Sequence, residues 1–214
     1  VLYLPNGVNF EQFNEAIRYR EKLGTRPPTL LYSGTLDLRW GVDLPLRAMP
    51  SLLEQVPDAF LLIAGTGPAE GKLKALSQSL GLGKSVQFLG MIPYKDLPQV
   101  MARADVGLAT SREDIFRHFA SPLKIVEYMA AGLPVICSGG GEAELMINES
   151  GGGKNIPFLP GAFTQAAQSL LTRQEELTAC RRAAISYAHS RSWQRLGEQL
   201  AEFLVHLTDQ AARA

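Results

Sequence analysis

Glu127 is an acid inside an otherwise apolar helical pattern, and its position makes it the first candidate for chemistry. The stretch SPLKIVEYMAAGLPVICS (121–138) has the pattern of a helix, a turn and a short buried strand. Ser121 is expected to cap this helix, and Pro122 suits its first turn because proline lacks the N–H that would be unpaired there. Gly132 is expected to end it.

The start of this predicted helix is a candidate phosphate-binding site. A helix N-terminus carries free N–H groups and a partial positive charge, and both favour an anion. Two turns further on, Glu127 could accept hydrogen bonds from the hydroxyls of a ligand whose phosphates lie at that N-terminus. A nucleoside diphosphate has this layout. The other face should meet a sheet, because apolar residues recur on it at helical spacing: Ile125, Val126, Met129 and Ala130.

The elements that must position this helix predict an α/β fold with a doubly wound parallel sheet, which is Rossmann-like. Strands are expected at 29–34, 59–65, 86–90, 105–110, 134–137 and 156–159. Helices are expected at 9–23, 43–55, 70–81, 95–104, 142–148 and from about 163 onwards. Apolar strands that alternate with helices indicate a parallel sheet covered on both faces. Such sheets bind ligands outside the carboxyl ends of their strands, so the loops there should form the site.

Three regions are expected along the 214 residues. Residues 1–24 form a lead-in segment, residues 25–172 a Rossmann-like ligand-binding domain, and residues 173–214 the C-terminal helices. The last helices should pack on this domain or on a missing one, because leucine-type residues recur in them at helical spacing. The chain starts at Val1 without an initiator methionine, and we expect it to be a fragment.

Loops at the predicted strand ends supply further candidate contacts. Arg39 in the loop 33–41 could pair with a diphosphate through two parallel hydrogen bonds, or it could be a solvated arginine. Gly65 and Gly67 would let the backbone approach a ligand closely, although a simple turn explains them equally well. Residues 90–93 could offer backbone groups and an apolar wall to a base.

The loop before Ser121 is rich in charge. A crowd of charged side chains is usually a solvated surface, and this is what we expect here. The loop contains Arg112, Glu113, Asp114, Arg117 and His118.

Composition and missing motifs narrow the function. Lysine plus arginine equal aspartate plus glutamate at 21 each, so net charge gives no reason to expect nucleic acid or an anionic membrane as a partner. No apolar run approaches the roughly 18–20 residues that span a bilayer, and no signal peptide is visible. Cys137 and Cys180 have no ligand-like spacing, which favours a reduced, cytoplasmic setting.

Sequence motifs for several other chemistries are missing. The sequence has no Asp-x-Asp pair, and its three histidines lack partners at metal-ligand spacing, so no metal site is expected. GGGK at 151–154 lacks the rest of a P-loop and is expected to be a turn. No G-x-S-x-G elbow supports hydrolase chemistry.

The strand-end loops, taken in order, resemble the C-terminal, nucleotide-sugar-binding domain of retaining glycosyltransferases with the GT-B fold, of the family 4 type. The resemblance runs over nearly the whole chain. It rests on PNGVNF, LLYSGTL, FLLIAGTGP, VQFLGMIP and ADVGLATS, and most specifically on SPLKIVEYMAAGLPVI.

This resemblance implies a set of donor-binding residues. By position, Glu127 corresponds to the acid that hydrogen-bonds the ribose hydroxyls of the donor. Ile92, with Met91 beside it, would lie against the nucleobase. The helix start and the glycine loops would face the diphosphate: Ser121, Pro122, Leu123, Lys124, Gly34, Thr35, Arg39, Gly65 and Gly67.

The resemblance also implies an activity. The full enzyme would transfer a sugar from a UDP- or GDP-sugar with retention, without a metal or another cofactor. The acceptor would bind an N-terminal domain, and membrane contact would be made only through that domain. The protein would be cytoplasmic or peripheral at the cytoplasmic face of the membrane.

Three positions depart from the family pattern and leave alternatives open. The first acid of the Glu-x7-Glu motif falls at Phe119, and the usual diphosphate-clamping Arg and Lys fall at Thr35 and Trp40. Arg39 lies one residue before Trp40 and could substitute. A degenerate, non-catalytic nucleotide-binding or scaffold domain therefore remains an alternative. So does another GT-B enzyme, such as a sugar-nucleotide epimerase or a phosphorylase, although no pyridoxal lysine for the latter can be located.

Overall fold

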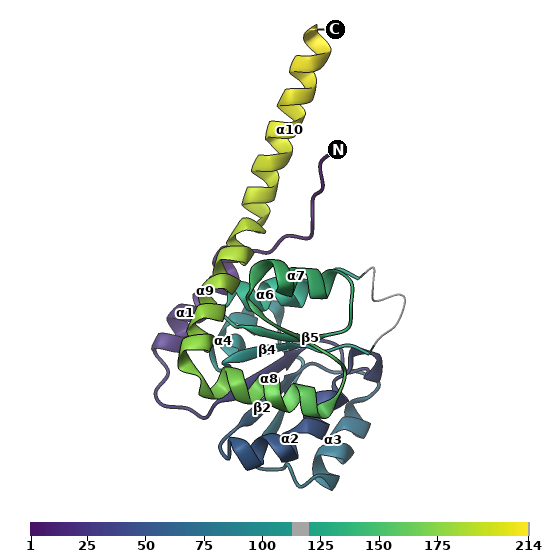
Figure 1. Cartoon of the computed structure of the whole chain (residues 1–214), viewed down its shortest axis with the longest axis vertical. Helices are drawn as coiled ribbons and strands as arrows, with labels where there is room; N and C mark the ends of the chain where they lie inside the picture. The colour runs from purple at the N-terminus through teal and green to yellow at the C-terminus, as the bar shows by residue number, and fades with distance from the viewer. Residues whose placement is uncertain (113–119, 214) are drawn as a thin grey trace.

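A parallel sheet of six strands forms the centre of the protein, as the computed structural model of residues 1–112 and 120–213 shows (Figure 1). The strand order is β3-β2-β1-β4-β5-β6, and every neighbouring pair is parallel. The strands are β1 (Thr29–Ser33), β2 (Phe60–Ala64), β3 (Val86–Gly90), β4 (Val106–Ala109), β5 (Val135–Ser138) and β6 (Gly153–Ile156). The predicted doubly wound fold is confirmed, and the order reverses between β1 and β4, where such sheets bind ligands.

Helices cover both faces of the sheet. One face carries α2 (Asp43–Gln55), α3 (Glu70–Ser79) and α8 (Pro160–Thr172). The other carries α1 (Phe10–Glu21), α4 (Leu97–Ala102), α6 (Leu123–Ala130), α7 (Glu142–Ser150) and α9 (Gln174–Ser190). The remaining helical elements are η1 (Leu38–Trp40), η2 (Tyr94–Asp96) and α10 (Trp193–Arg213).

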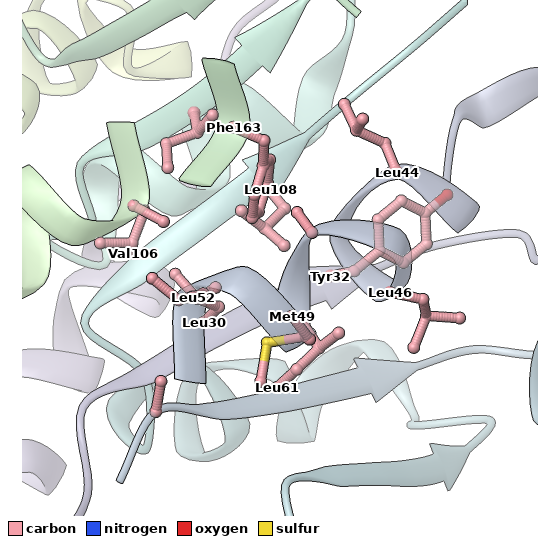
Figure 2. Close-up of a cluster of buried hydrophobic side chains, with 14 of the residues drawn as sticks. Leu30, Tyr32, Leu44, Leu46, Met49, Leu52, Leu61, Val106, Leu108 and Phe163 are labelled. Carbon is pink, nitrogen blue, oxygen red and sulfur yellow. The ribbon is translucent and has the colours of Figure 1, made fainter. Parts of the chain in front are cut away.

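The alternation of side chains along β1 supplies two separate cores. Leu30 and Tyr32 point to one face, where they pack with Met49 of α2 and Phe163 of α8 (Figure 2). Leu31 points to the other face and joins the apolar side of α6. Every residue of β1 is buried, which fits a strand covered on both faces, and its three central residues are apolar or aromatic. Burial of one such large side chain contributes roughly 1.5–3 kcal/mol.

Helix α6 begins later than the sequence predicts. Its first residue is Leu123, and Pro122 is the N-cap residue, whose carbonyl accepts from Ile125 N at 3.1 Å. The predicted cap by Ser121 is wrong, because this residue lies one position too early and its buried Oγ has no partner in the described part of the chain. Gly132 follows the helix with φ 69°, as expected, and the four predicted sheet-facing residues of α6 are buried.

Strand β6 also differs from its prediction. It spans Gly153–Ile156 rather than 156–159, so the GGGK stretch is partly strand and not only a turn. Gly151, with φ 63°, ends α7 in the left-handed conformation, and the chain then pairs directly with β5. A Cβ at Gly153 would lie 2.0 Å from Val135 O, so only glycine can start the strand here. Pro157 lacks the N–H that would extend the ladder, which ends the strand before 158.

The N-terminal segment meets the junction between α9 and α10. Val8 N donates to Arg191 O at 3.0 Å, and Trp193 N donates to Val8 O at 3.1 Å. The lead-in helix α1 contributes Phe13 to the core, and α9 packs against α6. Helix α10 extends away from the body (Figure 1), and most of its apolar side chains are exposed: Trp193, Leu200, Leu204, Val205 and Leu207.

Candidate functional site

A cavity of about 420 Å³ lies at the carboxyl ends of β1, β2 and β3, beside the start of α6. Its volume is within the range of small-molecule sites. Its lining comprises Ser33, Gly34, Thr35, Ala64, Gly65, Thr66, Met91, Ile92, Tyr94, Leu97, Leu123, Lys124 and Glu127. The cavity thus opens at the edge of the sheet where the fold predicts a ligand.

Two glycines bring backbone together at the floor of the cavity. Gly34 has φ 138° and Gly65 has φ 133°, a region that favours glycine. A Cβ at Gly65 would lie 1.9 Å from Gly34 O, and a Cβ at Gly34 would lie 2.9 Å from Lys124 Nζ. Side chains are therefore excluded from both positions, and a ligand in the cavity would lie close to main-chain atoms and to the Lys124 ammonium group.

Helix α6 presents its N-terminus and two charged groups to this cavity. The adjacent residues Leu123 and Lys124 line it, and so does Glu127, which lies about one turn further along the helix. The Lys124 Nζ lies 4.4 Å from the centre of the Tyr32 ring, a cation–π contact that holds the lysine over the end of β1. The helix N-terminus and the ammonium group both favour an anion at this place.

Buried contacts fix α6 against the sheet. The Tyr128 hydroxyl accepts from Ser33 N at 2.7 Å and lies 2.9 Å from Ser33 Oγ. A Cβ at Gly107 in β4 would lie 2.5 Å from the Tyr128 ring, so this glycine makes room for it. Burial raises the pKa of Tyr128, and the phenol remains a neutral group. The helix that carries Glu127 is thereby fixed in position against β1 and β4.

Glu127 reaches across the cavity to a residue of η2. The Tyr94 hydroxyl donates to Glu127 Oε1 at 2.9 Å. Burial raises the pKa of Glu127, while the Tyr94 hydrogen bond and the nearby Lys124 charge act in the opposite direction. Burial and the adjacent carboxylate raise the pKa of Tyr94 to about 12. A partly buried acid with a shifted pKa that lines a cavity is typical of a functional site.

The structure brings together eight of the twelve predicted site residues. The cavity is lined by Gly34, Thr35, Gly65, Met91, Ile92, Leu123, Lys124 and Glu127. Gly67 packs against the backbone of Leu36, where a Cβ would lie 2.5 Å from Leu36 O. Pro122 lines a smaller neighbouring cavity of about 50 Å³ together with Trp40, Lys124 and the end of β5. Ser121 is in neither lining.

Arg39 lies outside the cavity lining. Its Nη2 pairs with Asp37 Oδ2 at 2.8 Å, and its side chain is 76% exposed. The Asp37 carboxylate also accepts from Arg39 N at 2.9 Å, which fixes the η1 turn. Within the part of the chain that the structure describes, the lining of the main cavity includes the cation Lys124 and does not include Arg39.

The charged loop before Ser121 is described only at its start. Arg112 Nη2 pairs with the buried Asp43 Oδ2 at 2.6 Å, and its guanidinium lies 4.7 Å from the Phe158 ring centre. Arg112 itself is therefore tied to α2 and is not simply a solvated side chain. The other predicted residues lie outside the described residues: Glu113, Asp114, Arg117, His118 and Phe119.

Sequence reasoning missed five cavity residues. Ser33, Ala64 and Thr66 immediately adjoin predicted glycines at strand ends, so extending the strand-end rule by one residue would have included them. Leu97 lies within the helix predicted at 95–104, and Tyr94 directly precedes that helix in a position given no role. Only the three-dimensional contact with Glu127 distinguishes Tyr94.

Metal binding and membrane spanning receive no structural support from the described part of the chain. Within residues 1–112 and 120–213, no group of three or more His, Cys, Asp or Glu is placed to hold a metal ion. No described helix combines the length and apolar character needed to cross a bilayer.

The chain belongs to the glycosyl transferases group 1 family, whose model matches residues 13–187. The GDP-mannose-dependent alpha-(1-6)-phosphatidylinositol monomannoside mannosyltransferase of Mycolicibacterium smegmatis is 32% identical over 216 residues, covering 94% of this chain and 55% of that protein. The chain thus spans about half the length of this curated relative.

Solved structures share the fold. Sucrose-phosphate synthase from Thermosynechococcus elongatus aligns with a TM-score of 0.79 at 25% identity, over 97% of this chain and 52% of that one. Anabaena HepE in complex with UDP-glucose aligns with a TM-score of 0.74 at 20% identity, over 94% of this chain and 56% of that one.

Proposed function

We propose that this chain is the donor-binding half of a glycosyltransferase that transfers a sugar from a nucleoside diphosphate sugar to an acceptor. Membership of the glycosyl transferases group 1 family supports the reaction class. The observation that carries the proposal is the placement of Glu127, Lys124 and the start of α6 around one cavity with Gly34 and Gly65. These groups match the hydroxyls and phosphates of a nucleoside diphosphate.

The donor would lie across the carboxyl ends of β1, β2 and β3. Its diphosphate would lie at the start of α6, against the backbone of Gly34 and Thr35 and near Lys124. The ribose hydroxyls would donate to the Glu127 carboxylate. Met91 and Ile92 would form the wall beside the base, and Met91 is 76% exposed and available to cover it.

The chain's own groups would stabilise the departing diphosphate. Negative charge grows on this leaving group as the sugar–oxygen bond breaks, and fixed N–H dipoles with one cation stabilise it in the transition state. Lys124 and the α6 N-terminus are placed to do so. We propose that transfer proceeds with retention and without a metal, in the manner of the family 4 type.

The acceptor site would belong to a domain outside this chain, and we propose that the exposed apolar face of α10 packs against it. The full enzyme would then be cytoplasmic or peripheral at the cytoplasmic membrane face, with any membrane contact made by that other domain. On this proposal the isolated chain binds nucleotide and transfers no sugar. Sugar transfer by the isolated chain would contradict it.

A thermal-shift screen with UDP, GDP, ADP and CDP tests the proposed donor site. A ligand that binds the native state stabilises it by about 2.7 kcal/mol at one hundred times its Kd, so a cognate nucleotide raises the melting temperature. GDP is the first candidate because of the name of the Mycolicibacterium smegmatis relative, and UDP is the second because of the Anabaena complex. A melting temperature unchanged by all four would favour the scaffold alternative.

A further inference from the structure

Tyr94 makes a contact with Glu127 that joins two walls of the cavity. It lies in η2, after β3, and its hydroxyl donates to Glu127 Oε1 at 2.9 Å over a sequence separation of 33 residues. Both residues line the cavity. The bond therefore bridges the wall beside the proposed base site and the helix beside the proposed phosphate site.

The Tyr94 ring packs against the protein core. It packs edge-on against Phe13 of α1, with ring centres 5.4 Å apart and an interplanar angle of 80°. Phe13 is fully buried in the core, so it provides a fixed support. The backbone turn is closed by Asp96 N, which donates to Pro93 O at 2.9 Å. Although Tyr94 is 54% exposed, the position of its hydroxyl is set by these contacts.

We infer that Tyr94 is a positioning residue of the donor site, which holds the Glu127 carboxylate by one oxygen and presents the other to the sugar hydroxyls of the ligand. This inference rests on the proposed function. A carboxylate has about four lone-pair sites on its two oxygens, so the phenol occupies one and leaves acceptors for a diol. A fixed orientation lowers the entropy cost of binding.

The same contact favours the ionised carboxylate. Among the described residues, Tyr94 from η2 and Lys124 from α6 are the groups that lower the pKa of Glu127 against the effect of burial. The Tyr128 phenol on the same helix is buried on the side of Ser33, and its pKa is raised mainly by that burial, with a smaller contribution from the Glu127 charge. Tyr94, with its pKa raised to about 12, remains a hydrogen-bond donor through the neutral range.

The test is nucleotide binding by Tyr94→Phe, measured by calorimetry with GDP and UDP from pH 4.5 to pH 8. The variant keeps the ring on Phe13 and removes only the hydroxyl, so its melting temperature should stay near that of the wild type. We expect affinity at neutral pH to fall about fivefold to tenfold. Because loss of the bond raises the pKa of Glu127 further, binding should also be lost at a higher pH than in the wild type.

Two controls distinguish positioning of the Glu127 carboxylate from a nonspecific effect of removing a tyrosine hydroxyl on nucleotide affinity. In the Glu127→Ala background, which leaves the Tyr94 hydroxyl no acceptor at this position, Tyr94→Phe should add little, since its effect passes through the carboxylate. Tyr187→Phe removes a phenol bonded to Glu149 Oε2 at 3.4 Å on the C-terminal side of the domain, away from the cavity, and should leave affinity unchanged.

Other results would overturn the inference in distinguishable ways. A wild type that binds GDP or UDP while Tyr94→Phe binds equally well or more tightly would show that the phenol is neutral or competes with the ligand. An additive effect in the Glu127→Ala background would assign Tyr94 a direct contact with the ligand instead. A wild type that binds no nucleotide would overturn the proposed function, and this role with it.

Discussion

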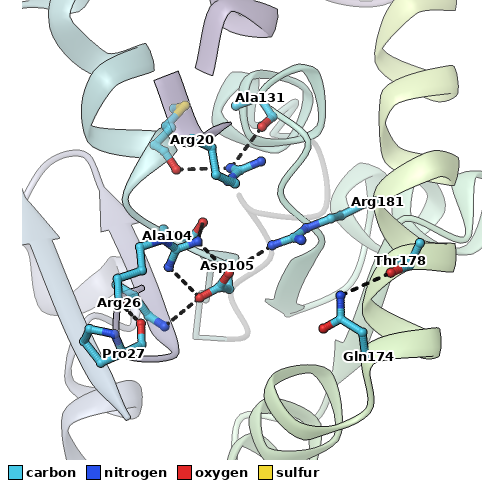
Figure 3. A network of polar contacts seen from close by, with 11 residues as sticks. Arg20, Arg26, Pro27, Ala104, Asp105, Ala131, Gln174, Thr178 and Arg181 are labelled. Atoms are coloured by element: carbon cyan, nitrogen blue, oxygen red, sulfur yellow. Dashed lines mark hydrogen bonds and ion pairs between the residues drawn. The ribbon is translucent and has the colours of Figure 1, made fainter. Parts of the chain in front are cut away.

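Asp105 and Glu127 are two partly buried acids at opposite edges of the same sheet, and their surroundings differ. Asp105 precedes β4 at the amino edge, where Arg26 donates to both of its oxygens at 2.7 Å (Figure 3). Arg181 from α9 adds a bond at 2.9 Å, and Thr29 N adds another at 3.0 Å. Among the described residues, Glu127 at the carboxyl edge accepts one side-chain hydrogen bond, from Tyr94, and a cavity lies beside it.

The difference indicates that the acid at one edge of the sheet stabilises the fold, whereas the acid at the other edge is available to bind a ligand. The bonds from Arg26, Thr29 and Arg181 outweigh burial and lower the pKa of Asp105. Burial outweighs the few partners of Glu127 and raises its pKa. An acid whose acceptor sites are filled by the protein holds elements together, whereas one with unfilled acceptor sites beside a cavity is available to a ligand.

Asp105→Ala should produce the largest change in stability. It leaves the guanidinium groups of Arg26 and Arg181 without their shared partner, and breaking such a pair costs about 3 kcal/mol. The melting temperature should therefore fall by roughly 6–12 °C. Scanning calorimetry measures this, and calorimetric titration of the folded variant should give the wild-type nucleotide affinity. A large affinity loss with normal stability would reverse the assignment of the two acids.

The pH dependence of stability should have opposite signs at the two acids. The folded-state pKa of Asp105 is lowered, so its contribution is present above the unfolded value of about 3.9 and is lost as pH falls through the folded value. The folded-state pKa of Glu127 is raised, so its ionisation costs stability above that value, and the cost is relieved as pH falls.

The effect at Glu127 is expected to be the smaller one. It is measured by comparing the free energy of unfolding in denaturant of Glu127→Gln and the wild type from pH 3 to pH 8. The variant should be slightly more stable at neutral pH, and the difference should vanish below the unfolded pKa of about 4.3. A variant that is less stable at neutral pH by the amount expected for Asp105→Ala would show that Glu127 is a structural acid.

Sequence patterns predicted the fold more completely than the site. Continuous apolar strands and helical periodicity identified the parallel sheet, since both depend on local spacing. The position of β6 was missed because close backbone approach at Gly153 depends on its neighbour β5. The cap was wrongly assigned to Ser121 because the chain stays extended through Pro122, so the helix starts one residue later.

The site was predictable where residues lie in strand-end loops or in the helix with the recognisable motif, and not where a partner comes from a distant element. Glu127, Lys124 and the glycines Gly34 and Gly65 are brought to one cavity by the topology itself. The bond from Tyr94 to Glu127 depends on the path of the chain after β3, and its support by Phe13 depends on the docking of α1. No periodic pattern encodes either contact.

Titration calorimetry of GDP and UDP into Glu127→Ala, beside the wild type, tests the central claim most directly. Loss of a hydrogen bond to a charged group costs about 1.5–3 kcal/mol, so affinity should fall roughly tenfold to a hundredfold while the melting temperature changes little. Glu149→Ala is the matched control, because Glu149 also accepts from a tyrosine, Tyr187, but is not in the cavity lining. Unchanged nucleotide affinity in a folded Glu127→Ala protein would contradict the account.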